Sequence, residues 1–373
     1  MFLQSIQISN YKNLDLNFTP SSGLNLLIAD NGRGKTNLLE AINYLAINKS
    51  FRNNEEVFPD NKIAEYVSIA AGATKDNSSN NLRLVWTADY HKHYYFNQKL
   101  TNFAKVRKNI KTLLYAPTSI NLVTDGASVR RDFLDTALIS LLPNLKTIIS
   151  TYYKVIRQKN ALLTNSQAND INSQLTYWNQ QIVSLATTIT VERILLVQLL
   201  IPLMNDIGAQ IFNLTNYNIT FNISSKFVDS SQLSLPRNKL QELITSNLKE
   251  KLQLNRSKEI ETKRVLYGSH KDDYEFMIAN RTVRYYASRG QQRLFSLVLH
   301  LALLELIESE YEDSYIILLD DIFAELDKSH RMNTCRYLLK KQETKQHQFF
   351  ITSANEEDFT SEFKAKTHLL QLD

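Results

Sequence analysis

One short stretch constrains the fold more than any other part of the chain. The segment "IADNGRGKTNLLEAI" (residues 28–42) nearly matches the phosphate-loop pattern G-x-x-x-x-G-K-[ST]. Gly34, Lys35 and Thr36 occupy the expected places, and Ala29 stands where the pattern has its first glycine. The apolar stretch "GLNLLIAD" leads into the loop, and the residues after it show the three- and four-residue apolar spacing of a helix. The pattern predicts a strand, a phosphate-binding loop and a helix in that order.

The loop carries the groups that a bound nucleotide requires. Gly32 and Gly34 let the backbone come close to phosphate groups at the start of a helix. Lys35 is expected to contact the β and γ phosphates, and Thr36 to ligate Mg²⁺. We therefore predict ATP and Mg²⁺ as cofactors; a chance glycine turn is the alternative. The residues expected to contact the nucleotide are Asn31, Gly32, Arg33, Gly34, Lys35, Thr36 and Asn37.

A second motif supplies a pair of carboxylates. In "IILLDDIFAELD" (residues 316–327), four apolar residues precede Asp320 and Asp321, as in a buried strand that ends at the nucleotide-binding edge of a sheet. Asp320 is expected to hold Mg²⁺ through water, together with Thr36. Asp321 is the expected catalytic residue, which orients or deprotonates the attacking water. A turn followed by a helix cap is the alternative interpretation.

A third motif resembles a second phosphate cradle. In "YYASRGQQRLFSLVLHLALLEL" (residues 285–306), Ser288, Arg289, Gly290 and Gln291 begin an amphipathic helix whose first amides suit a phosphate group. A single nucleotide has one γ-phosphate and needs one cradle. Two cradles in one chain are expected when two subunits face each other and each completes the other's site. Taken alone, the stretch is an ordinary helix cap.

Basic residues concentrate in one segment. The chain of 373 residues has a formal net charge of +5, but residues 101–160 hold ten Lys or Arg against three Asp. Such a local excess of positive charge predicts a polyanionic partner. On charge alone, a solvated helical surface explains the segment equally well.

The remaining composition indicates a cytoplasmic globular protein. The single cysteine, Cys335, excludes an internal disulfide framework and fits a reducing compartment. The N-terminus shows no pattern of a signal peptide. The most apolar run, residues 194–204, is about half the length of a membrane span and contains Gln198 and Pro202. We therefore expect a buried helix there and no membrane association.

The pattern of elements predicts an α/β protein with an insertion. Strand patterns occupy much of the first 115 residues, and residues 127–214 are almost wholly helical in pattern. Leu175, Trp178, Ile182, Leu185 and Ile189 form a packing stripe of about two heptads, which is too short for a long coiled coil. Two apolar strands, "SYIILLD" and "HQFFITS", follow near the end of the chain. We expect a nucleotide-binding lobe into which a helical lobe is inserted.

The motifs together resemble the ABC-type ATPases, and within them the RecF family of DNA repair proteins. The resemblance covers nearly the whole chain, and the order and spacing of its motifs agree. It depends on the segments "NLLIADNGRGKTNLLEAINYL", "SFR", "YAPTSINLVTDGASVRRDFLD", "GSHKDDYEF", "YASRGQQR", "LLDDIFAELD" and "FITSAN". Within "AELD", Asp327 corresponds to the D-loop and is expected to contact nucleotide. The resemblance implies an ABC-type head in residues 1–117 and 216–373, with a mostly helical lobe in residues 118–215 and no long coiled coil.

The resemblance also implies a function. A RecF-like protein is an ATP-dependent DNA-binding protein of recombinational gap repair. ATP closes two subunits into a homodimer that clamps double-stranded DNA near a single-strand gap, and slow, DNA-stimulated hydrolysis releases it. The implied partners are gapped DNA and RecR, which acts with RecO to load RecA. The expected DNA surface consists of phosphate contacts from Arg107, Lys108, Lys111, Arg130 and Arg131.

The chain departs from the RecF family pattern at two positions, Ala29 and Ser269, and it differs from most other ABC-type ATPases at Ser353 and Asp321. Ala29 replaces a glycine, Ser269 stands where the family usually has proline, and Ser353 occupies the place of the switch histidine of transporters. Asp321 is one methylene shorter than the glutamate of most relatives, so slow hydrolysis is expected.

Three other functions remain alternatives. A transporter ATPase subunit shares the three nucleotide motifs, but the basic segment, Asp321 and Ser353 count against it. A nuclease with an ABC-like head would need a further acidic metal-binding domain. A protein that binds ATP and scarcely hydrolyses it cannot be separated from a slow ATPase by sequence.

Overall fold

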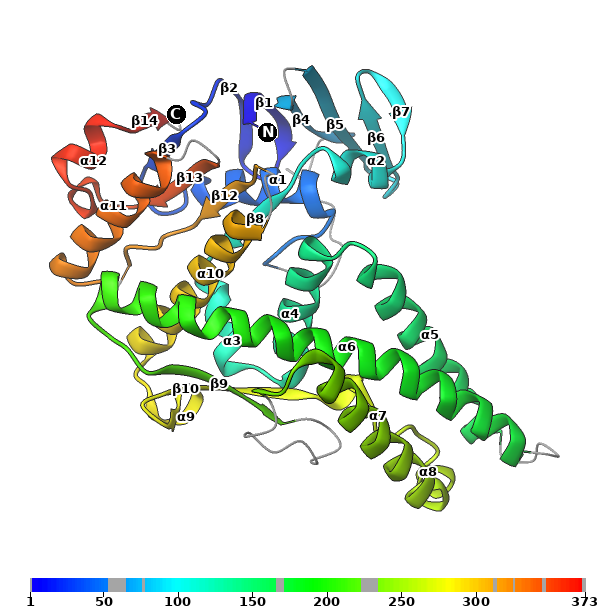
Figure 1. The fold of residues 1–373 in the computed structure, drawn as a ribbon. Coiled ribbons are helices and arrows are strands. Elements are labelled where there is room, and N and C mark those ends of the chain that lie inside the picture. Colours follow the sequence, from blue (N-terminus) through cyan, green and yellow to red (C-terminus); the bar gives the residue numbers. More distant parts are fainter. Residues whose placement is uncertain are drawn as a thin grey trace. The chain divides into compact units, whose positions relative to one another are not determined.

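The chain divides into two compact units. The computed structural model describes residues 2–52, 65–75, 78–165, 171–222, 234–310, 314–324, 326–343 and 347–370. The first unit comprises residues 1–119, 209–213 and 308–373, and the second comprises residues 120–208 and 214–307. Figure 1 shows the elements of both. Residues 216–307 thus belong to the second unit, whereas the predicted head lobe includes them; the lobe boundaries remain a prediction.

A five-stranded parallel sheet carries the nucleotide motifs of the first unit. Its strand order is β14-β3-β13-β12-β8. The strands are β3 (Leu24–Ile28), β8 (Thr112–Tyr115), β12 (Ile316–Leu319), β13 (Gln348–Ser353) and β14 (His368–Leu370). All four residues of β12 and all six of β13 are buried, as expected for central strands of a parallel sheet covered on both faces. The carboxyl ends of β3, β12 and β13 meet at one edge, where both motifs begin.

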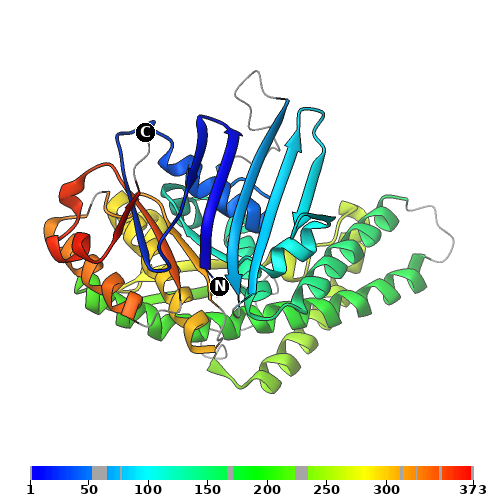
Figure 2. The same cartoon turned by 90° about the horizontal axis from the view of Figure 1, so that it is seen from above.

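An antiparallel sheet forms a second layer of this unit. Its order is β2-β1-β4-β5-β6-β7, and Figure 2 looks down on its long strands. The strands are β1 (Phe2–Tyr11), β2 (Leu14–Phe18), β4 (Tyr66–Lys75), β5 (Ser78–Thr87), β6 (Lys92–Phe96) and β7 (Lys99–Thr101). Alternate residues of β5 are buried, namely Leu82, Leu84 and Trp86. This sheet therefore presents one apolar face to the core and one polar face to solvent.

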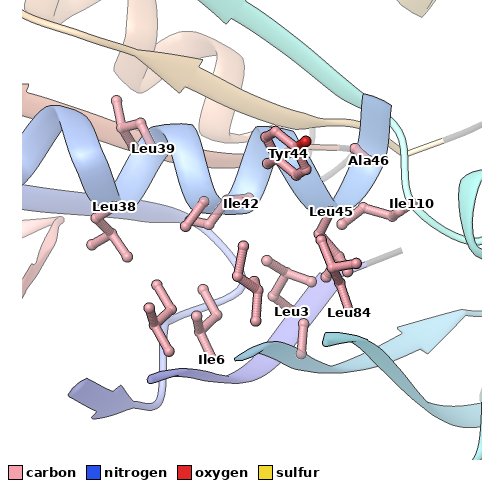
Figure 3. Packing of buried hydrophobic residues seen from close by; sticks show 14 of the residues in the cluster. Leu3, Ile6, Leu38, Leu39, Ile42, Tyr44, Leu45, Ala46, Leu84 and Ile110 are labelled. Atoms are coloured by element: carbon pink, nitrogen blue, oxygen red, sulfur yellow. The ribbon is translucent and has the colours of Figure 1, made fainter. Parts of the chain in front are cut away.

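Helix α1 (Lys35–Ile47) fills the core of the first unit. Its buried residues Leu38, Ile42 and Leu45 lie towards Leu3 and Ile6 of β1 in Figure 3. Buried residues of the parallel strands β12 and β13 belong to the same cluster. The predicted strand, loop and helix are thus confirmed. The start of α1 is held in position because the helix is buried on several sides. The other helices of this unit are α2 (Phe103–Lys108), α11 (Lys328–Glu343) and α12 (Ser361–Ala365).

The second unit is mainly helical, as the sequence predicts. Helix α6 (Ile171–Ile207) is its longest helix, and α5 (Leu145–Thr164) and α7 (Arg237–Leu254) both pack against it. A three-stranded sheet, β11-β10-β9, completes the unit. The strands are β9 (Tyr217–Asn222), β10 (Asp273–Ile278) and β11 (Arg281–Thr282). The helices are α3 (Asn121–Thr124), α4 (Ala127–Leu141), α5 (Leu145–Thr164), α7 (Arg237–Leu254), α8 (Arg256–Thr262), α9 (Val283–Tyr286) and α10 (Arg289–Glu310), which ends in the first unit.

Helix α6 contains the apolar run. In the described chain, residues 172–212 are the one helical region long and apolar enough to span a membrane, and 44% of its most apolar window is buried. A core helix of a water-soluble protein passes the same test. Arg193 of α6 is 1% exposed, and its guanidinium lies 2.7 Å from Asp135 and 3.3 Å from Asp272. A paired charge in its middle indicates a helix packed within protein. The expected burial of residues 194–204 is confirmed for one face of the helix. The other face is accessible, since Leu199 is 50% exposed.

Candidate nucleotide site

The phosphate-loop backbone is shaped by two glycines with positive φ. Gly32 has φ +88° and Gly34 has φ +98°, and Gly34 immediately precedes α1. A Cβ atom on Gly34 would lie 2.6 Å from the Leu14 side chain, whereas one on Gly32 would meet open space. Ala29 is not among the described residues with positive φ. The backbone conformation at position 34 therefore favours glycine strongly, and a Cβ there would also displace the Leu14 side chain; the conformation at position 29 makes no such demand.

Lys35 lies folded back over its own loop. The side chain is 8% exposed, and its ammonium donates to the Ala29 carbonyl and, at 3.0 Å, to the Asp30 carbonyl. Burial lowers the pKa of the Lys35 ammonium and outweighs Asp321, Asp320 and Asp30, whose charges raise it. An anionic phosphate would favour the charged ammonium and replace these carbonyls. The Lys35 ammonium therefore lies next to the exposed loop residues 31–33, which the sequence predicts to bind phosphate.

Asp320 joins the two motifs. The Thr36 hydroxyl donates to Asp320 Oδ1 at 3.1 Å, and the Thr352 hydroxyl donates to the same oxygen at 2.7 Å. Burial raises the pKa of the Asp320 carboxyl, although both hydrogen bonds and the charges of Arg52 and Lys35 lower it. A hydroxyl and a carboxylate at the loop are oxygen donors of the kind that Mg²⁺ prefers. The two residues predicted to hold the metal are therefore brought together.

Thr352 is a functional candidate that the sequence analysis did not single out. Its side chain is fully buried at the end of β13, and its hydroxyl accepts from the Asp321 amide at 2.9 Å while donating to Asp320. Asp321 has φ +51°, a left-handed conformation that aspartate tolerates better than most residues. One hydroxyl thus fixes the Asp320 carboxylate and the Asp321 backbone. A threonine at the end of a buried strand gives no sequence signal for this role.

Asn13 braces the loop from the turn between β1 and β2. Its amide donates to the Gly32 carbonyl at 3.2 Å and accepts from the Asn37 amide at 2.6 Å. Arg52 also donates to Asn37, at 2.8 Å. The predicted contact residue Asn37 is therefore held by two neighbours. Asn13 was not predicted, because its partners are distant in sequence.

The third motif lies in the second unit and is a reciprocal helix cap. The Ser288 amide donates to Gln291 Oε1 at 2.9 Å, and the Gln291 amide donates to Ser288 Oγ at 3.3 Å. This is the capping-box geometry, which satisfies helix amides without a ligand. Ser288, Arg289 and Gln291 are exposed, and Gly290 is half-buried. The motif is therefore an accessible helix start, and its contact with nucleotide remains a prediction.

Two further motif residues of the first unit, Asp327 and Ser353, have protein partners. Asp327 caps α11, because its carboxylate accepts from the His330 amide at 2.9 Å. Its side chain is 62% exposed, and the predicted nucleotide contact remains a prediction. The Ser353 hydroxyl donates to the Asp358 carboxylate. The serine in the place of the switch histidine therefore has a hydrogen-bond partner within the protein.

The basic residues expected at a DNA surface are divided between the two compact units. Arg107, Lys108 and Lys111 belong to the first unit, with Lys108 exposed and the Lys111 ammonium 5.5 Å from the centre of the Tyr315 ring. Arg130 and Arg131 belong to the second unit.

Arg130 is buried and paired in the structure, and its expected role at a DNA surface remains a prediction. Arg130 is 4% exposed, and its guanidinium donates twice to Asp273, at 2.8 and 3.1 Å. Arg131 is half-buried and donates to the Asp272 carbonyl at 2.7 Å. Charge counting missed this because the acidic partners are about 140 residues away in sequence.

Comparisons with known proteins agree with these motifs. The family model of the RecF/RecN/SMC N-terminal domain matches residues 2–368. The chain is 31% identical to the DNA replication and repair protein RecF of Natranaerobius thermophilus, over 98% of this chain and 94% of that protein. It is 32% identical to the RecF protein of Bacillus cytotoxicus, over 90% of this chain and 89% of that protein.

A solved structure shows the same fold. The structure described as the recombination mediator protein RecF with ATP in the RecFOR pathway superimposes with a TM-score of 0.81 and 25% sequence identity. The match covers 96% of this chain and 93% of that one. The predicted fold class, an α/β ABC-type head with a mostly helical lobe, is thereby confirmed. The phosphate loop, the paired carboxylates and these matches show that the chain belongs to the RecF family of DNA replication and repair proteins, whose ATPase domain is of the ABC/SMC type.

Proposed function

We propose that this protein is an ATP-dependent DNA-binding protein of recombinational gap repair. The observation that carries the proposal is the Thr36–Asp320–Thr352 cluster at the exposed phosphate loop. It joins both nucleotide motifs within one compact unit. The similar solved structure is described as RecF with ATP in the RecFOR pathway, which supports ATP as the nucleotide.

In this proposal the first unit binds ATP and Mg²⁺. The amides of residues 31–34 and the Lys35 ammonium bind phosphate groups, and Thr36 and Asp320 hold Mg²⁺. Mg²⁺ neutralises phosphate charge when it is bound. Asn37 and Asn13 keep the loop in shape. We place this site in a head lobe formed by residues 1–117 and 216–373, with residues 118–215 as the inserted lobe.

Hydrolysis is proposed to be slow. Asp321 orients or deprotonates the attacking water, and its short side chain reaches less far than glutamate would. The positive φ of Asp321 and its amide bond to Thr352 support a fixed position for this residue. DNA stimulates the step by stabilising the closed dimer. An ATP-binding clamp that scarcely hydrolyses is separated from this proposal by steady-state turnover with and without gapped DNA.

ATP is proposed to close two copies into a clamp on double-stranded DNA near a single-strand gap. Ser288, Arg289, Gly290 and Gln291 of one copy, with Asp327, contact the nucleotide of the other. Their partial or full exposure supports this arrangement, because a partner can reach them. The clamp acts in the cytoplasm with RecR and RecO, which load RecA.

The experiment that tests the proposal measures molecular mass in solution. The protein is sized by light scattering with ATP, with ADP and without nucleotide, each with and without a gapped duplex. We expect a dimer only with ATP, and monomers with ADP or without nucleotide. With the gapped duplex present, we expect the DNA complex to form best with ATP. A protein whose mass and DNA binding are the same in all three nucleotide states would contradict the proposal.

A further inference from the structure

Helix α5 is basic along its exposed face. Its sequence, "LKTIISTYYKVIRQKNALLT", contains four Lys or Arg and neither Asp nor Glu. Lys146, Ser150, Lys154 and Arg157 are all exposed, at spacings of four, four and three residues. We call these four residues the α5 basic face. Because residues three and four apart are neighbours on a helix, they form one row about 17 Å long.

The opposite side of α5 is fixed in the protein. Leu145, Ile149, Tyr152 and Ile156 are buried, and the helix packs against α6. The fourth cation of the helix, Lys159, is fully buried and donates to Glu259 at 2.5 Å and to Asn179 at 2.6 Å. The structure therefore neutralises the cation that faces inwards. Within the described residues, Lys146, Lys154 and Arg157 form no ion pair with a carboxylate.

A neighbouring loop adds positive charge beside this helix. The Val265 amide donates to Asn160 of α5 at 2.8 Å, which places the exposed residues Lys263 and Arg264 next to the end of the row. Among the residues of this loop and α8, Glu261 is an exposed acid. The cations outnumber it clearly.

We propose that the α5 basic face, flanked by Lys263 and Arg264, binds the sugar–phosphate backbone of double-stranded DNA. This inference rests on the proposed function. A duplex carries about one negative charge per 1.7 Å of its axis, so a row of about 17 Å runs along roughly ten phosphate charges. The row carries Lys, Arg and Ser side chains, which bind phosphates without reading the sequence.

The chemistry of the face distinguishes duplex DNA from other anionic partners. Single-stranded DNA is bound by exposed aromatic side chains that stack on bases, and the row contains none. A membrane surface is bound by a basic helix that also presents large apolar residues to the lipid. The large apolar residues of α5 are not among the exposed ones in the described chain. A rigid row of cations and a hydroxyl group is suited to the regular backbone of a duplex.

The test uses charge reversal with a matched control. The test variant is Lys146→Glu/Lys154→Glu/Arg157→Glu. The control variant is Lys239→Glu/Lys249→Glu/Lys340→Glu, which makes the same change in net charge at three exposed lysines outside α5. Binding of a fluorescent 30-base-pair duplex is measured by anisotropy with a non-hydrolysable ATP analogue, between about 50 and 200 mM salt, the range over which phosphate contacts weaken strongly. Melting temperature and ATP-analogue affinity show that each variant is folded.

We expect the test variant to bind the duplex at least about tenfold more weakly, and its salt slope to flatten by about three units, because each lost phosphate contact contributes about 0.9. The control variant should stay within about threefold of the unchanged protein, since its three lysines lie outside the α5 basic face and exposed charges are screened by salt. Unchanged affinity and slope in the test variant would overturn the inference. If the unchanged protein itself fails to bind duplex DNA, the proposed function fails instead.

Discussion

The starts of α1 and α10 are both candidate phosphate cradles, but they are built differently. At α1, Gly34 has a positive φ and a Cβ atom there would crowd the Leu14 side chain, and Lys35 is buried against loop carbonyls. At α10, Ser288 and Gln291 satisfy each other's amides in an exposed cap. The first is enclosed by residues from distant parts of the chain. The second is formed by hydrogen bonds within its own turn.

This difference indicates two kinds of site. A loop that is already shaped and surrounded can bind a ligand without a partner, because its ordering cost is met in folding. The amides and the hydroxyl of the exposed cap already have hydrogen-bond partners within their own turn. We therefore expect the cap to contact a ligand only when a second surface presents one. Changes at α1 should therefore affect nucleotide binding itself, and changes at α10 should affect association.

The largest effect is expected from Gly34→Ala. The added Cβ would lie 2.6 Å from Leu14 at a φ of +98°, so the loop must move away from its phosphate-binding shape. We expect the affinity for a fluorescent ATP analogue to fall at least about a hundredfold, or about 2.7 kcal/mol.

The matched control is Ala29→Gly, at the first position of the same loop. Ala29 is outside the described positive-φ residues, so its methyl group causes no backbone strain. Its affinity change should stay below about tenfold, or about 1.4 kcal/mol. Equal effects of the two substitutions would show that the glycine at position 34 does not shape the site.

The next effect concerns association alone. Ser288→Arg puts a long cation at the exposed cap, where it blocks approach of a second copy. We expect monomers to bind ATP with nearly unchanged affinity and to form no dimer, as measured by titration and light scattering on the same sample. Normal dimerisation with ATP would show that the α10 start is only a helix cap.

A smaller effect is expected from Thr352→Val, which keeps the shape and removes the hydroxyl. Asp320 then loses a hydrogen bond that lowers its pKa, and the Asp321 amide loses its acceptor. Because burial already raises the pKa of Asp320, the substitution raises it further, and protons compete with Mg²⁺ at higher pH. We expect Mg²⁺-dependent ATP binding near pH 7 to weaken by about tenfold, which corresponds to one lost hydrogen bond of about 1–2 kcal/mol.

The pH dependence separates this role from simple packing. Mg²⁺-dependent binding should be lost as the pH falls through the Asp320 pKa, and in Thr352→Val this loss should begin at higher pH. Thr352→Ser keeps the hydroxyl and should restore the original pH profile. If valine and serine give the same profile as threonine, the hydroxyl has no part in positioning Asp320.

The sequence by itself determined the local parts of this protein. Apolar runs and the glycine-lysine pattern predicted β3, the loop and α1, and the same reasoning predicted the helical stretch that α4, α5 and α6 form. These features depend on residues close together in the chain, so periodicity and spacing reveal them. The capping-box geometry at Ser288 is local in the same way.

Only the tertiary structure decided which polar groups are paired. Arg130 belongs to a basic cluster in sequence but is buried against Asp273, whereas Lys154 in the same segment is exposed. Thr352 and Asn13 gained their roles from partners that folding brings to them. A buried charge or hydroxyl must find a partner wherever the fold provides one, because leaving it unpaired costs free energy. Since those partners lie far away along the chain, no local pattern could have assigned them.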